Sequence, residues 1–97
     1  MAINLVDYEV LAQGQATYAK KAGELGEILN SLNTMNSNLM QGWQNDTARA
    51  FVDRFNSDHK VAIEKVIGAL NEISDYIQKY SAARQEEDAA GAGAVRG

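Results

Sequence analysis

The stretch NLMQGWQNDT, residues 38–47, separates two long segments with helical periodicity. Gly42 can end the first helix in the left-handed backbone conformation that glycine tolerates. Asn45 or Asp46 can cap the second helix, because their side-chain oxygens accept hydrogen bonds from its first N–H groups. A connection this short, at residues 41–45, brings the two helices side by side in opposite directions. The stretch therefore predicts an antiparallel helical hairpin.

The first helix is expected over residues 7–40, with Asp7 as its N-cap. Large apolar residues recur at every seventh position, which is the pattern of a helix packed along its length against another helix. The residues predicted to form this hairpin seam on the first helix are Leu11, Tyr18, Leu25, Leu32 and Leu39.

The second helix is expected over residues 46–83, where apolar residues alternate at steps of four and three. Its predicted hairpin seam consists of Val52, Phe55, His59, Val66, Ile73 and Tyr80, with small residues and Tyr76 between them. Residues 1–84 thus form one hairpin domain. The last stretch, 85–97, has almost no large side chain to bury, so a flexible tail is expected there.

Both helices carry more apolar residues than one hairpin can bury. This second stripe comprises Ile28, Met35, Ile63, Ile67, Leu70 and Ile77. Since two antiparallel helices bury only one stripe each, the second stripe is a candidate dimer surface. The predicted fold class is all-α, a helical hairpin that pairs with a second chain into a four-helix bundle. The rival interpretation is a monomeric hairpin with exposed apolar residues.

Composition excludes several classes of protein. The chain has 97 residues and a net charge of −4, which disfavours nucleic acid as a partner. It has no cysteine, so disulfides and cysteine metal sites are excluded. No apolar run approaches the ~18 residues of a membrane span. The N-terminus lacks the basic and apolar regions of a cleavable signal peptide, so secretion would need another route.

Nothing in the sequence indicates a catalytic, cofactor or metal site. His59 has no second histidine or cysteine to share a metal, although it could act as a pH-sensitive interface residue. Asp53, Asp58 and Glu64 fall on the predicted polar face, and a rod of two helices offers no cleft for an acid–base pair. We therefore expect no enzyme and no cofactor.

The turn and its surroundings resemble the WXG family, the early-secreted-antigen-like small proteins of type VII secretion. Trp43 and the aromatic Phe51 match the family layout, and Asn45 stands where the family has Gly. Asn is the commonest non-glycine residue to accept left-handed backbone angles, so the turn is expected to form with it. The resemblance covers about residues 1–85.

The resemblance implies a small secreted protein that acts as a dimeric substrate, effector or targeting partner. Its partners would be a second copy or a related WXG chain, the secretion ATPase, and a larger toxin, for which it could serve as chaperone. Trp43, Asn45 and Phe51 would form the turn motif read during export. Two alternatives stay open, namely a membrane-active effector and a structural coiled-coil adaptor unrelated to secretion.

The family's export mark, a Tyr followed four residues later by Asp or Glu, is absent at the expected place. Tyr76 is followed at that spacing by Tyr80, and Tyr80 by Arg84. A partner chain could supply the signal instead.

Overall fold

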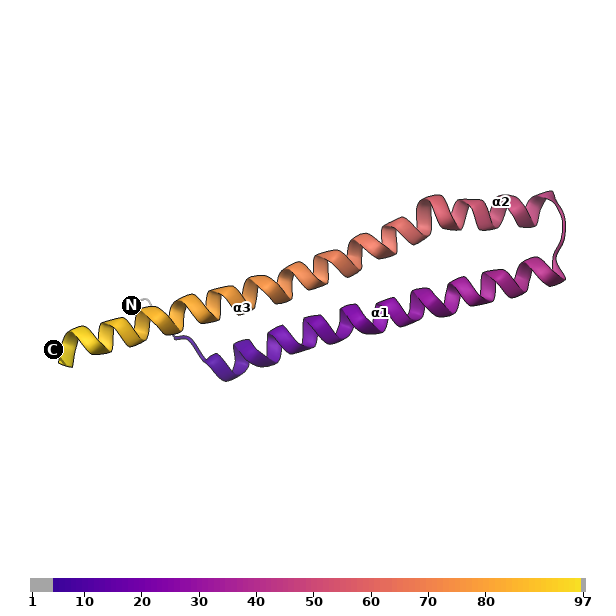
Figure 1. The fold of residues 1–97 in the computed structure, drawn as a ribbon. Coiled ribbons are helices and arrows are strands. Elements are labelled where there is room, and N and C mark those ends of the chain that lie inside the picture. Colours follow the sequence, from indigo (N-terminus) through magenta and orange to yellow (C-terminus); the bar gives the residue numbers. More distant parts are fainter. Residues whose placement is uncertain (1–4, 97) are drawn as a thin grey trace.

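The computed structural model describes residues 5–96, and the side chains of residues 5–89. Helix α1 spans Tyr8–Gly42, α2 spans Asp46–Arg54, a π-helical turn η1 spans Phe55–His59, and α3 spans Lys60–Arg96. Helix α1 runs antiparallel to the continuous rod of α2, η1 and α3 (Figure 1). The molecule measures 76 × 23 × 18 Å. The prediction of an all-α antiparallel hairpin is confirmed.

The two ends of α1 are formed without left-handed residues. Asp7 caps α1, since its Oδ1 accepts hydrogen bonds from the N–H groups of Glu9 and Val10 at 3.0 and 3.2 Å. At the other end, α1 runs through Gly42, and Trp43 follows it at φ −138° and ψ 89°. No described residue has a positive φ. The predicted left-handed ending at Gly42 is therefore wrong, because extended backbone makes the turn.

Helix α3 is longer than the sequence predicts, since it continues past residue 83 to Arg96. The added stretch contains no proline and has several Ala and Glu residues, which favour helix. Two contacts anchor its first turn: Arg84 pairs with Asp88 at 3.5 Å, and the hydroxyl of Tyr8 donates to the same carboxylate. The predicted flexibility of residues 85–97 stays a prediction.

The π turn η1 adds one residue to the second helical rod. The backbone N–H of Lys60 donates to the carbonyl of Phe55, five residues earlier instead of the usual four. One extra residue rotates all later side chains by about 100° relative to an uninterrupted α-helix. Figure 1 also shows that α2 is bent away from the line of α3 at the π turn. Helices commonly kink at such turns.

The hairpin seam follows this extra residue. Before the π turn, the seam positions are Ala48, Val52 and Phe55, in the predicted register. After it, the residues that lose exposure come one position later than predicted; they are Lys60, Ile63, Ile67, Leu70, Ser74 and Ile77. On α1 the most buried residues are Ala22, Leu29 and Asn36, seven residues apart.

A hydrogen bond and the position of Ile77 opposite Gly14 show the register of α3 against α1. The Ser74 hydroxyl donates to the carbonyl of Gln15 at 2.9 Å. A Cβ built on Gly14 would lie 3.7 Å from Cδ1 of Ile77, an ordinary packing contact. Since Ser74 and Ile77 are three residues apart, they lie on one face of α3, and this face is the seam.

The two predicted stripes of the second helix are consequently exchanged. Val66, Ile73 and Tyr80, predicted for the seam, are 49, 40 and 43% exposed, and His59 is exposed as well. Ile63, Ile67, Leu70 and Ile77, predicted for the dimer stripe, are half-buried on the face turned to α1. The physical reason is the π turn. It adds one residue, and a prediction that alternates steps of four and three residues does not include that extra residue. On α1, Leu11, Leu25 and Leu39 are half-buried, whereas Tyr18 and Leu32 are exposed at the edge of the seam.

Candidate functional site

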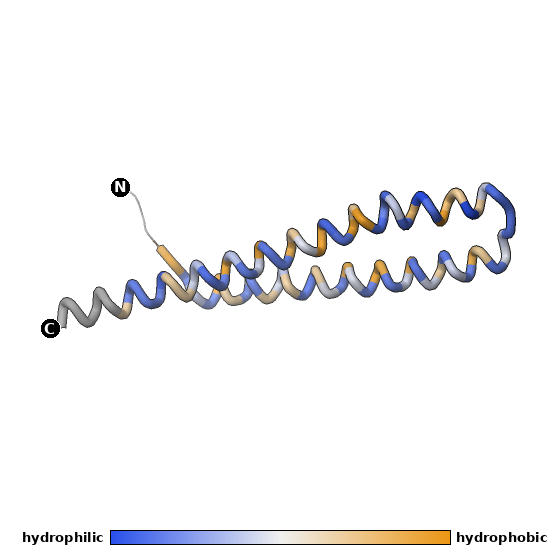
Figure 2. The backbone as a smooth tube through the Cα atoms, turned by 45° about the horizontal axis from the view of Figure 1, so that its top comes forward, coloured by the Kyte–Doolittle hydropathy of each residue, from blue (hydrophilic) through white to orange (hydrophobic). Residues whose placement is uncertain are grey.

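A row of large apolar side chains remains exposed along both helices. Seven of these residues make up what we call the apolar face: Ile28, Leu32 and Met35 on α1 and Val66, Ile73, Tyr76 and Tyr80 on α3. In Figure 2, apolar positions alternate with polar ones along the coloured part of both helices, so the apolar residues are spread along the hairpin. Repeated exposure of this kind is typical of a helix surface that contacts another molecule.

The two halves of the apolar face lie on the same side of the hairpin. Each member directly precedes a buried or half-buried residue, as Ile28 precedes Leu29 on α1 and Val66 precedes Ile67 on α3. Both helices are right-handed, and they run in opposite directions. Positions that precede the seam on one helix therefore lie beside those that precede it on the other. The apolar face is thus a surface shared by α1 and α3.

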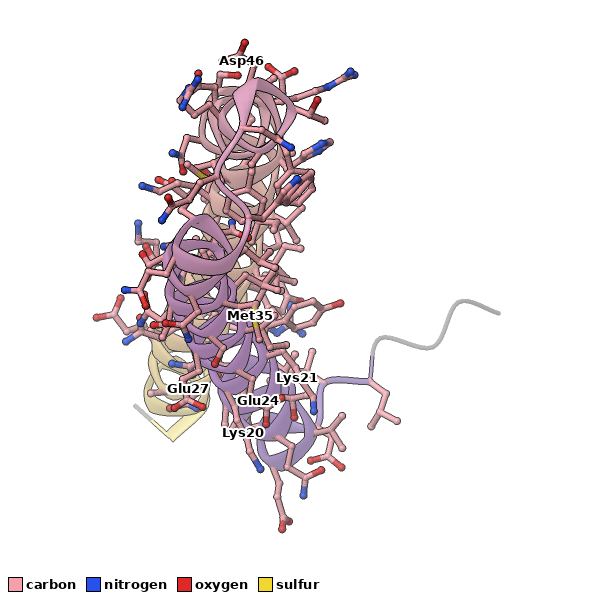
Figure 3. All side chains as sticks on the ribbon, turned by 90° about the vertical axis from the view of Figure 1, so that its right-hand side faces the viewer. Lys20, Lys21, Glu24, Glu27, Met35 and Asp46 are labelled. Carbon is pink, nitrogen blue, oxygen red and sulfur yellow. The ribbon has the colours of Figure 1, made fainter. Side chains whose placement is uncertain are left out.

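The view along the rod shows that apolar and charged side chains leave α1 in different directions. In Figure 3, Met35 and Glu27 project from different sides of α1. Ile28 and Met35, which the sequence assigns to the dimer stripe, are 52 and 53% exposed and belong to the apolar face. The members of the apolar face on α3 are residues that the sequence predicted for the seam, because the two stripes of α3 are exchanged.

At the open end of the hairpin, the apolar face adjoins a shallow hollow. It is lined mainly by Leu5, Val6, Val10, Leu11 and Tyr80. Leu5 is 82% exposed and Val10 is 58% exposed, although both are large aliphatic residues. The hollow extends the apolar surface towards the N-terminal side of α1.

The Trp turn lies at the closed end. The rings of Trp43 and Phe51 pack at a centroid distance of 5.8 Å and an angle of 43°. Such a tilted aromatic pair adds stabilisation beyond the area that it buries. Trp43 is half-buried and Phe51 is 44% exposed, so part of the pair is open to a partner.

Asn45 contributes to the turn through a hydrogen bond of its side chain. Its backbone is extended, at φ −155°, and its Oδ1 accepts a hydrogen bond from the N–H of Ala48 at 2.9 Å. The residue is therefore the N-cap of α2. The expectation that a left-handed Asn replaces a left-handed Gly here is wrong, since capping needs only extended backbone.

Ala48, which follows the Trp turn, occupies a position where only a small side chain fits. It is fully buried, at 0% exposure, on the first turn of α2. A larger side chain there would push α2 away from α1.

The residue types that bind metal ions do not cluster in the described part of the chain. Residues 5–96 contain no group of three His, Cys, Asp or Glu side chains that could hold a metal ion. His59 is exposed, with its ring centroid 6.4 Å from that of Phe55. None of the described helices has an apolar stretch suited to crossing a membrane.

Sequence reasoning misses two polar residues in the seam, Asn36 and Ser74, each 8% exposed. A heptad count based on large apolar residues cannot select them. One signal for the true seam of α3 was present: its stripe holds Ile63, Ile67, Leu70 and Ile77, whereas the other stripe contains Ala62 and Ala69. The larger aliphatic side chains mark the buried face.

Comparison with known proteins gives a family match over most of the chain. The family model WXG100, "Proteins of 100 residues with WXG", matches residues 5–89. An uncharacterized protein of Clostridium acetobutylicum is 23% identical to this chain over 87 residues, which cover 90% of this chain and 88% of the relative. No solved structure matches the chain.

Proposed function

The chain belongs to the WXG100 family, and from this premise we propose that it is a dimeric substrate, effector or targeting partner of a type VII secretion system. Members of this family are small helical proteins that these systems secrete, and they typically pair with a partner. The specific partner and the role after export belong to the proposal.

The observation that carries the proposal is the apolar face. Seven large apolar residues on one side of a two-helix rod lose favourable burial as long as they face water. A second hairpin laid against this side would cover them and complete a four-helix bundle, with helix packing like that of the first seam. The partner would be a second copy of the chain or a related WXG chain.

The Trp turn is the second element of the proposal. Trp43 and Phe51 form a compact aromatic pair at the tip of the rod, next to the capped start of α2. Phe51 directly precedes the seam residue Val52, so this partly exposed aromatic pair lies at the end of the rod on the side of the apolar face, where it could be read by the secretion ATPase. Since the Tyr-based export mark is absent, a partner chain, including a larger toxin with a helical domain, would contribute the second part of the signal.

Light scattering at micromolar concentration tests the pairing. We expect a helical species of about twice 10.6 kDa. Ile73→Glu places a charge on the apolar face and should yield a folded monomer. Gln78→Glu is the matched control, since this exposed residue directly follows the seam and lies on the opposite side. A wild-type chain that is a well-folded monomer would contradict homodimer formation.

Export is tested separately with Trp43→Ala. If the turn is recognised, cells that carry the secretion system will retain the variant while its dimer still forms in solution. Secretion of the variant at wild-type levels would restrict Trp43 to packing against Phe51.

A further inference from the structure

The seam of α3 contains polar residues at positions where a helix pair normally buries apolar ones. Lys60 is half-buried there, and Ser74 is 8% exposed. The residues one position before the α3 seam are exposed and mostly apolar; they are His59, Ala62, Val66, Ala69, Ile73 and Tyr76. The larger aliphatic residues favour the observed seam, whereas its lysine and serine oppose it, so both stripes are able to pack on α1.

Gly14 is not required by the observed register. It lies inside α1, where glycine weakens a helix relative to alanine. A Cβ built on it would lie 3.7 Å from Cδ1 of Ile77, an ordinary contact, so alanine would fit. If α3 were turned by one residue, Tyr76 would take the place of Ile77 opposite Gly14. The ring of Tyr76, now 72% exposed, is larger than the side chain of Ile77, and the missing Cβ would give it room.

Asn36 has an unmet hydrogen bond in the observed register. Its Nδ2 is buried without a hydrogen-bond partner, and Lys60, which lines the same hollow beside the π turn, offers only donors. With α3 turned by one residue, His59 would take the place of Lys60. A neutral imidazole has one acceptor nitrogen, which the Asn36 amide can use. The turned register therefore replaces two neighbouring donors by a donor and an acceptor.

The π turn is the part of the backbone that can produce this change. It spans Phe55–His59 and holds one residue more than an α-helical turn. If its hydrogen bonds change to the four-residue spacing, His59 becomes the next seam residue after Phe55, and α3 turns by about 100°. Helix α2 keeps its packing through Ala48 and Val52, because both residues precede the π turn.

We propose that the π turn is a two-state element, and that the unpaired hairpin interconverts between the observed register and a second register in which Tyr76 faces Gly14. Two anomalies of the observed register, the dispensable Gly14 and the unpaired Asn36 amide, are both resolved in the second one. The second register is the minor state, and it hides Val66 and Ile73 against α1.

Pairing distinguishes the two registers. In the observed register, Val66 and Ile73 directly precede seam residues and lie on the apolar face together with Ile28. In the second register, the exposed stripe directly follows the seam, so Ile67 and Ile77 would lie on the opposite side of the hairpin. The surface shared by α1 and α3 therefore exists only in the observed register. A second hairpin bound to this surface selects that register by population shift.

Methyl relaxation dispersion in nuclear magnetic resonance tests the two-state element in the full chain. The chain carries Ile28→Glu, which places a charge on the apolar face and keeps the chain monomeric without changing either stripe of α3. We expect exchange on the microsecond-to-millisecond timescale at the methyls of Ile67 and Ile77, which follow the π turn, and none at Val52, which precedes it. Deleting Ser57 removes the extra residue, so the exchange should disappear.

Gly14→Ala and Gly23→Ala form a matched pair of variants. Gly14→Ala places a Cβ where Tyr76 lies in the second register, so it should lower the minor population at least about tenfold. Gly23→Ala adds its Cβ in open space and should leave that population unchanged. A lack of exchange after the π turn, exchange that persists without Ser57, or equal effects of the two alanines would overturn the proposal.

The coupling to pairing rests on the proposed dimer and has a separate readout. In light scattering, the chain without Ser57 should dimerise at least as tightly as the wild-type chain. Inserting one Ala after Ser57 imposes the second register and should leave a helical monomer. A dimer of the inserted chain with wild-type affinity would overturn the coupling. A monomeric wild-type chain would contradict the dimer alone, since the dispersion experiment uses an unpaired chain.

Discussion

Helices α2 and α3 form one rod, but they follow the heptad pattern differently. In α2 the residues that pack on α1 are Ala48 and Val52, followed by Phe55 at the start of the π turn, in the register that the sequence predicts. In α3 the packing residues come one position later, with Ile67 in place of Val66. The five-residue hydrogen bond from Lys60 to Phe55 separates the two registers.

This difference shows that the rod of α2, η1 and α3 carries two apolar stripes. The π turn selects which of them packs on α1. Without the π turn, His59, Val66 and Ile73 would face α1. With it, these residues are exposed. The π turn therefore decides which stripe stabilises the hairpin and which stripe remains for a partner. Substitutions before, within and after the turn can test that selection.

The largest effect is expected at Phe55, the last seam residue before the register changes. Phe55 is 8% exposed, so Phe55→Ala should lower the free energy of unfolding by about 3–5 kcal/mol. Phe51→Ala is the matched control, because Phe51 is 44% exposed and its ring pairs with that of Trp43; about 1 kcal/mol is expected. Urea denaturation followed by circular dichroism measures both. Equal losses would mean that α2 packs through a different face.

The adjacent pair Ile67 and Val66 tests the register after the π turn. Ile67→Ala should destabilise the chain by about 2 kcal/mol, since Ile67 is half-buried against α1. Val66→Ala should cost less than about 1 kcal/mol in a single chain, because Val66 is 49% exposed. The opposite order would place Val66 in the seam and contradict the displacement by one residue.

Protein concentration separates the two kinds of contact further. The Ile67→Ala effect arises within one chain, so it should not depend on concentration. The Val66→Ala effect should grow as the concentration rises, because a partner that covers Val66 stabilises the folded chain by mass action. Urea midpoints recorded over a dilution series make this comparison.

At the start of α2, Asn45 is expected to contribute through its side-chain cap. Asn45→Ala removes the acceptor for the Ala48 N–H and should cost about 1 kcal/mol, whereas Asn45→Gly should cost only a few tenths. Thermal denaturation of the two variants gives the comparison. A clear gain in stability with Gly would mean that the turn needs left-handed backbone, contrary to the extended conformation of Asn45.

Deleting Ser57 tests the π turn itself. The deletion leaves Phe55 and Lys60 four positions apart, so an ordinary α-helix keeps the same seam and the stability should change by less than about 1 kcal/mol. A disulfide between Gly14→Cys and Ile77→Cys should still form. Inserting one Ala after Ser57 should instead turn Tyr76 towards Gly14, so that Tyr76→Cys replaces Ile77→Cys as the reactive partner. Unchanged cross-linking after insertion would contradict the register mechanism.

The sequence predicts the hairpin, the position of its turn and the start of α1, because these depend on local signals such as Asp7 and the stretch around Gly42. The predicted seam residues Val52 and Phe55 are among those that lose exposure, whereas on α3 the residues that lose exposure come one position later than predicted. A π turn has no residue signature in Phe55–His59, so a periodic count continues through it. The polar seam residues Asn36 and Ser74 are likewise found only from the structure, since their burial follows from the geometry of the two helices.

The smallest effect is expected at the far end of α3, where the structure extends the helix beyond the predicted end. The Tyr8 hydroxyl donates to Asp88, and this hydrogen bond raises the pKa of Tyr8 above its usual value of 10.0. Partial burial and the negative charge of Asp88 act in the same direction.

A raised pKa in the folded state means that folding favours the protonated tyrosine. The contribution of this contact to stability is therefore fully present below pH 10.0, and it is lost as the pH rises through the folded pKa. In Tyr8→Phe this part of the pH dependence should disappear, while Tyr18→Phe, which has no such contact, should retain it. Ultraviolet titration of tyrosinate, combined with thermal denaturation on both sides of that pH, measures the two quantities. A profile for Tyr8→Phe that matches the wild-type chain would show that α1 and the end of α3 separate in solution, so that the extra helical turns of α3 contribute nothing to the hairpin.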